Sequence, residues 1–303
     1  MSRLLIGLAI ASLTVAACTS SSGSPSTVSK SADGSGRPTI VAAFYPLEYA
    51  ARAVGGDAFD VIGLTPPGGE PHDLELSAAQ VAQIAGADLV LYVKGYQPAV
   101  DEAVAQQAAD HSLDVSAGLT LLPAAPDGDQ AATDPHVWLN PLNMAAIGTA
   151  INERLSASTP DGSSVFAANN DRLGSEMASL NEQFAAGLAS CRSRMMVVSH
   201  EAFAYLGAAY GFTQVGISGL SPDAEPSPAR MRDVADLVTR EGVTTIYYET
   251  LVDPKVAKTL ADETGATSAV LDPIEGLVAG SAESYPTVMA SNLTTLRTGQ
   301  GCT

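Results

Sequence analysis

Three of the four histidines in the chain lie at or beyond the ends of predicted strands. His72 follows the second such strand, His136 precedes a predicted helix, and His200 ends the apolar run that begins at Met195. Ligands of open α/β sheets bind outside the carboxyl ends of the strands. Because imidazole is a common metal ligand, these three residues predict a metal site. His111 instead lies at a predicted helix end, where we expect a solvated cap.

Carboxylates also occur at predicted strand ends. Asp272 and Glu249 each close an apolar run. Three imidazoles and one carboxylate suit tetrahedral Zn²⁺, whereas Mn²⁺ prefers more oxygen ligands. Glu249 has two interpretations: it holds a histidine tautomer, as metal-bound histidines usually require, or it is a structural partner of a surface arginine. Asp134 either orients its neighbour His136 or begins a turn.

An enzyme is the weaker interpretation of the same residues. His200-Glu201 resembles the start of the metalloprotease motif His-Glu-x-x-His, but the second histidine would fall at Ala204. The sequence contains no Gly-x-Ser-x-Gly nucleophile elbow. Four protein ligands would also leave no open position for a catalytic water. We therefore expect metal capture without turnover.

Eight strand-like runs are arranged in two sets of four. They are mostly continuous apolar runs, which is typical of parallel strands buried on both faces. Helical signals fall between them, so the pattern predicts α/β units with parallel sheets. The runs cover residues 39–45, 59–65, 87–93, 112–119, 195–199, 212–218, 243–249 and 268–272.

The helices have recognisable start signals. Ser77 begins a capping-box pattern with Gln80. Asn140, Ser227 and Asp253 each precede a proline, as expected of an N-cap before the first helical position.

One long helix is predicted between the two strand sets. From about 164 to 190 there is no proline, and apolar residues recur at helical spacing. The recurring residues are Leu173, Met177, Leu180, Phe184 and Leu188. The pattern favours two α/β lobes, 38–160 and 192–303, joined by a connecting helix within 161–191. The alternative is an ordinary helix within one domain.

The N-terminus predicts export. Arg3 and the apolar stretch that follows it are typical of a signal peptide over residues 1–17. Cys18 follows Val-Ala-Ala, which resembles a lipobox, so we expect Cys18 to carry a lipid. The alternative is an ordinary signal peptide that happens to contain a cysteine. The Ser/Gly-rich residues 18–37 predict a flexible tether. Together these features predict a lipid-anchored protein at the outer face of the cytoplasmic membrane.

The other two cysteines and the charge set further limits. Outside the cytoplasm, Cys191 and Cys302 are expected to pair as a disulfide; the alternative is two buried free thiols. The formal net charge of −18 argues against nucleic acid as a partner and against an anionic membrane surface. Membrane contact is therefore expected through the lipid anchor only.

Several segments together resemble the metal-binding solute-binding proteins of ABC importers, the zinc and manganese family known as cluster A-I. They occur in the family's order and span the chain after the tether. The segments are Gly69-Glu-Pro-His-Asp, Asp134-Pro-His-Val-Trp-Leu-Asn-Pro, Val197-Val-Ser-His-Glu-Ala-Phe-Ala-Tyr, Gly219-Leu-Ser-Pro-Asp-Ala-Glu-Pro-Ser-Pro and Leu271-Asp-Pro-Ile.

The resemblance implies two Rossmann-like lobes with the metal in the cleft between them. It implies His72, His136, His200 and Asp272 as ligands. Zinc-type members carry His at position 200 and manganese-type members carry Glu, so the resemblance implies one Zn²⁺, with Mn²⁺ as the alternative. Zinc-type members often have a long His-rich loop before the second ligand. Here the corresponding loop, residues 121–133, is short and contains no histidine.

The resemblance further implies a monomer that delivers its ion to an ABC permease in the membrane. Loading by a metallochaperone is compatible with this role. Some members of the family are described as surface adhesins, so an adhesin lipoprotein with an incidental metal site is the remaining alternative.

Overall fold

The computed structural model describes residues 36–124 and 133–303. The predicted signal peptide, Cys18 and nearly all of the tether lie outside the described residues, as do residues 125–132 of the segment 121–133. Residues 37–303 form one compact unit. Within the described residues, no helix is both long enough and apolar enough to cross a bilayer.

The first lobe is built on a parallel sheet of four strands. All four predicted strands of this half are present, each shorter than its apolar run. The order across the sheet is β2-β1-β3-β4. The strands are β1 (Thr39–Ala42), β2 (Asp60–Gly63), β3 (Leu89–Tyr92) and β4 (Ser112–Asp114).

The second lobe repeats this arrangement. Its four parallel strands have the order β6-β5-β7-β8, so the first strand of each lobe lies inside its sheet and the second lies at the edge. The strands are β5 (Met195–Val198), β6 (Thr213–Gly216), β7 (Thr245–Tyr248) and β8 (Thr267–Val270).

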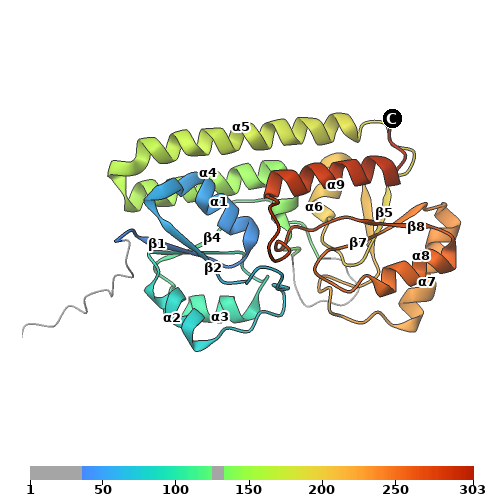
Figure 1. Ribbon diagram of the computed structural model, residues 1–303, viewed down its shortest axis with the longest axis horizontal. Coiled ribbons are helices and arrows are strands. Elements are labelled where there is room, and N and C mark those ends of the chain that lie inside the picture. The colour runs from blue at the N-terminus through green and yellow to red at the C-terminus, as the bar shows by residue number, and fades with distance from the viewer. Residues whose placement is uncertain (1–35, 125–132) are drawn as a thin grey trace, which may run out of the picture. The chain divides into compact units, whose positions relative to one another are not determined.

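Helices connect the strands (Figure 1). The capping box at Ser77 is confirmed, and the side chains of Asn140 and Ser227 cap their helices as expected. The helix after Asp253 begins at Lys255, one residue later than expected, and its N-cap is Pro254 rather than Asp253. The α-helices are α1 (Tyr45–Gly55), α2 (Ala78–Gly86), α3 (Pro98–Gln107), α4 (Pro141–Ser158), α5 (Ser163–Gly187), α6 (Ala204–Tyr210), α7 (Pro228–Glu241), α8 (Lys255–Thr264) and α9 (Tyr285–Gly299). Short 3₁₀ turns are η1 (Gly56–Ala58), η2 (Val137–Leu139) and η3 (Pro160–Gly162).

The long helix α5 runs along both lobes (Figure 1). Its 25 residues span about 37 Å at the usual helical rise. It packs against α1 and α4 of the first lobe and against α9 of the second. The apolar positions predicted from the spacing, including Leu173, Met177 and Phe184, form its buried face. The helix therefore joins the two lobes.

The interior continues from one lobe into the other. One apolar cluster contains strand residues of the first sheet together with Met196 and Val198 of β5. The Tyr205 hydroxyl donates to the Asp134 carbonyl at 2.8 Å, and the Trp138 indole donates to the Pro273 carbonyl at 2.7 Å. Buried polar contacts of this kind fix the facing edges of the lobes against each other.

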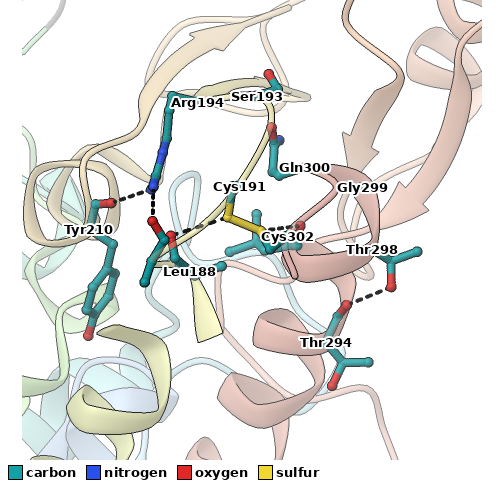
Figure 2. The surroundings of a disulfide bond; sticks show 12 residues. Leu188, Cys191, Ser193, Arg194, Tyr210, Thr294, Thr298, Gly299, Gln300 and Cys302 are labelled. Atoms are coloured by element: carbon teal, nitrogen blue, oxygen red, sulfur yellow. Dashed lines mark hydrogen bonds between the residues drawn. A yellow bond between two sulfur atoms is a disulfide. The ribbon is translucent and has the colours of Figure 1, made fainter. Parts of the chain in front are cut away.

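The predicted disulfide is present. Cys191, just after α5, is bonded to Cys302, just after α9 (Figure 2). The two residues are separated by 111 positions in the sequence. In the chain-entropy model, closing a loop of this size contributes up to about 4–5 kcal/mol. The bond fastens the C-terminus to the end of the connecting helix.

Candidate metal centre

His72 lies in the loop after β2. The Glu70 carboxylate accepts hydrogen bonds from the backbone N–H of His72 at 3.0 Å and of Asp73 at 3.3 Å, which fixes the loop around the histidine. The His72 side chain is 9% exposed. Burial lowers the pKa of His72 even though the Glu275 carboxylate opposes this shift.

His136 is held by its own segment. One carboxylate oxygen of Asp134 accepts from the His136 backbone N–H at 2.8 Å and from Nδ1 at 2.9 Å. Asp134 therefore both shapes the turn and orients the ring, with Nε2 directed away from it. Burial opposes the charged form, but the Asp134 and Glu275 carboxylates outweigh it and raise the pKa of His136.

His200 follows the central strand β5. Its Nδ1 donates to Glu249 Oε1 at 2.9 Å, and the Ser199 hydroxyl donates to the same oxygen at 2.6 Å. Glu249 follows β7, which pairs with β5, so two adjacent strand ends supply the histidine and the carboxylate. This contact supports the tautomer interpretation of Glu249 over pairing with an arginine. Burial again favours the neutral imidazole, but the Glu249 and Glu275 carboxylates outweigh this effect and raise the pKa of His200 well above its ordinary value.

Glu275 was not predicted from the sequence. It lies in the segment after β8 and is 2% exposed. Its Oε1 is 3.1 Å from Nε2 of each of the three histidines, namely His72, His136 and His200. Burial alone would raise the pKa of Glu275, but the imidazoles hold it well below its ordinary value.

Asp272, the fourth expected ligand, lies outside the cluster that the three histidines form with Glu275. Its carboxylate accepts from the Thr250 hydroxyl at 2.6 Å and from the Ile274 backbone N–H at 2.7 Å. Ile274 has φ 57°, the one positive value among non-glycine residues in 36–124 and 133–303. Asp272 thus stabilises a left-handed turn, and that turn directs the Glu275 side chain to the histidines. The chain therefore turns once more after Asp272 before it reaches the histidines.

The ligand atoms of the cluster lie close enough together to share one small ion. One nitrogen or oxygen of each of the four residues lies within 4.8 Å of the others. Nε2 of His200 and Nε2 of His136 are 3.4 Å apart. A tetrahedral Zn²⁺ with bonds of about 2.0–2.1 Å places two nitrogens about 3.3–3.4 Å apart. The donor set, three imidazoles and one carboxylate, therefore fits Zn²⁺ in both chemistry and scale.

Neighbouring residues complete the surroundings of the site. The Trp138 ring is fully buried and lies 5.3 Å from the His136 ring, so it is both a core residue and a wall of the site. His111 is not part of the cluster: its ring contacts Asp110 and the Ile84 carbonyl. Its side chain is partly buried rather than solvated. It is also not a helix cap, because α3 ends at Gln107.

Two parallel α/β lobes with a buried His₃–carboxylate cluster between them define a two-lobed metal-binding protein. The family model for the periplasmic component A of the zinc-uptake complex, ZnuA, matches residues 40–299. The chain belongs to this family.

Individual relatives agree with the assignment. The chain is 31% identical over 313 residues to the high-affinity zinc uptake system protein ZnuA of Bacillus subtilis, covering 97% of this chain and 96% of that protein. It is 34% identical over 285 residues to the zinc-binding lipoprotein AdcA of Streptococcus pneumoniae. That match covers 88% of this chain and 56% of AdcA, so the chain spans little more than half of that relative.

Solved structures share the fold. The Zn(II)-bound ZnuA-like domain of Streptococcus pneumoniae AdcA superposes with a TM-score of 0.76 at 34% identity, covering 88% of this chain and 99% of that domain. The laminin-binding protein Lmb of Streptococcus agalactiae, described as having adhesin and metal-transporting activity, superposes with a TM-score of 0.78 at 29% identity over 87% of this chain and 99% of Lmb.

Proposed function

We propose that this protein captures one Zn²⁺ outside the cytoplasm through His72, His136, His200 and Glu275. The observation that carries the proposal is the convergence of three imidazole Nε2 atoms on one buried carboxylate oxygen at 3.1 Å. Two of the imidazoles are oriented by carboxylates at Nδ1, as is usual for metal-bound histidine.

Zinc is the preferred ion of this donor set. Three nitrogens and one oxygen match the ligands of tetrahedral Zn²⁺, whereas Mn²⁺ favours sites richer in oxygen. The relatives named as zinc-binding and zinc uptake proteins support the same choice.

Capture is followed by delivery rather than chemistry. Four protein ligands leave no coordination position for a reacting water, which a catalytic zinc site keeps open. In this proposal the loaded monomer docks on an ABC permease that imports the ion, and Cys18 anchors the domain beside it by a lipid. The names of the zinc-uptake family and of the Bacillus subtilis relative support delivery for import.

Metal content and competition test the function. The chain from Cys18 onward, purified mildly, is expected to contain one zinc per molecule by elemental analysis. After chelator stripping, competition titration should show zinc bound far more tightly than manganese. Preference for manganese would contradict the zinc assignment. Failure to bind both zinc and manganese would contradict the site.

A further inference from the structure

The two carboxylate oxygens of Glu249 have different surroundings. Oε1 accepts from the Ser199 hydroxyl and from His200 Nδ1. Oε2 has no hydrogen-bond partner among the described residues. It is nevertheless shielded from water, because the residue is only 4% exposed. A buried acceptor without a donor is costly, and native structures usually supply such a group with a partner.

Glu249 also lines a pocket of ≈ 230 Å³ in the second lobe. The walls are mainly apolar and include Ile217, Tyr248 and Val252. Asp223, Glu225 and Asp253 line it as well, and these three acids are exposed. Of the described residues that line it, none is a lysine or an arginine. The pocket therefore combines apolar walls and an acidic rim, and the Glu249 side chain, which carries the buried Oε2, forms part of its lining.

This combination does not suit an inorganic ion. Within the described part of the chain, the His/Glu cluster is the one set of three or more metal-ligating groups close enough to chelate. The acids of the pocket are too dispersed to join a second set. Mainly apolar walls with few polar groups are instead typical of sites for organic ligands.

We propose that this pocket binds a primary alkylammonium group. An ammonium supplies the missing donor to Oε2 as a charge-assisted hydrogen bond, while its alkyl stem contacts the apolar walls. A guanidinium prefers two free carboxylate oxygens for its fork, and Oε1 is already occupied. Tyr248 already attracts an ammonium: Nζ of Lys258 lies 4.8 Å from the centroid of its ring.

The ligand chemistry has two sources, a free small amine and a lysine side chain of a protein partner. The pocket does not depend on which metal occupies the histidine cluster. Zinc content is measured first in every sample, so a failure of the zinc proposal is visible separately.

Binding is tested by NMR titration of the metal-loaded protein from Cys18 onward with n-butylammonium, n-butanol and n-butylguanidinium. The ammonium should give saturable shifts at pocket residues and bind about 10-fold or more tightly than the alcohol, the ratio expected of a charged hydrogen bond. Equal binding of the alcohol, tighter binding of the guanidinium, or no saturable shift would overturn the proposal.

Variants separate the buried oxygen from the rim. Glu249→Gln should abolish the preference for ammonium over alcohol. Asp223→Asn with Asp253→Asn should weaken ammonium binding about two- to fivefold, as expected for exposed charges, and leave the alcohol unchanged. Asp262→Asn removes an exposed acid of α8 that does not line the pocket and should have no effect. If Asp262→Asn weakens binding as much as the rim pair, the attraction is general and the site is refuted.

A capped tripeptide with a central lysine identifies the source. Binding at least as tight as that of n-butylammonium assigns the pocket to a lysine of a protein partner. Binding of the amine without the peptide assigns it to a small free amine.

Discussion

The two lobes have the same strand order but hold their histidines differently. In the second lobe, His200 follows an inner strand, and the adjacent strand end supplies Glu249 to its Nδ1. In the first lobe, His72 lies on a loop after the edge strand β2 and is fixed through its backbone by Glu70. An inner strand has neighbours on both sides, so it can place a ligand and its supporting carboxylate together. Here the edge strand is followed by a long loop, and the support for its histidine comes from that loop.

The largest expected effect is the loss of a histidine from either lobe. His72→Ala, His136→Ala and His200→Ala should each weaken zinc binding by more than about 100-fold, beyond the effect usual for supporting residues. Competition titration measures the loss, and His111→Ala is the matched control with no expected change. If His72→Ala behaves like the control, the first lobe contributes one ligand rather than two.

Glu275 and Asp272 test which acid of the second lobe reaches the metal. Glu275→Ala should reduce zinc affinity about 100-fold or more, because it removes a ligand. Asp272→Asn should leave binding nearly intact and lower the unfolding free energy by about 1.5–3 kcal/mol, since it weakens hydrogen bonds to a charged acceptor. Isothermal titration and chemical denaturation separate the two effects. The reverse result would make Asp272 the ligand.

The supporting carboxylates should matter less than the ligands. Asp134→Asn and Glu249→Gln keep the size of each side chain but remove its charge, and each should cost about 10–100-fold in zinc affinity. The comparison between them measures whether local support or support from a neighbouring strand orients the ring better. An effect below twofold at both positions would show that packing alone orients the rings.

The pH dependence gives the finest distinction, which is between His72 and the other two histidines. Zinc binding displaces protons from imidazole. The raised pKa values of His136 and His200 keep them protonated above the ordinary value of 6.5, whereas His72 is already neutral there because its pKa is lowered. Zinc affinity should therefore still rise between pH 6.5 and the raised values, by about 10-fold per pH unit for each displaced proton. Affinity that is flat above pH 6.5 would contradict this assignment.

Much of the fold could be predicted because its signals are local. Continuous apolar runs identified all eight strands, and the caps at Ser77, Asn140 and Ser227 identified helix starts. Strand ends were overestimated by one to five residues, because apolar residues continue past the last ladder hydrogen bond into the buried turns that follow. The pairing of Cys191 with Cys302 followed from the number of cysteines and the expected compartment.

The fourth member of the metal cluster could not be predicted in the same way. Asp272 and Glu275 lie in one segment, and both are acids in a region expected near the site. The decision depends on the conformation of Ile274, which is rare for a β-branched residue, so no propensity indicates it. Glu275 as a second acid, three residues beyond the predicted strand end at Asp272, was the available signal.

The sequence by itself determined the alternation of strands and helices, the long connecting helix and the three candidate histidines, because each depends on neighbours in the chain. The tertiary structure decided that Glu275 rather than Asp272 joins the imidazoles and that Glu249 supports His200. Among the described residues, it also left Glu249 Oε2 without a hydrogen-bond partner beside a pocket. These outcomes depend on how separate strand ends and one strained turn are placed relative to one another. Local sequence does not determine such contacts between distant residues.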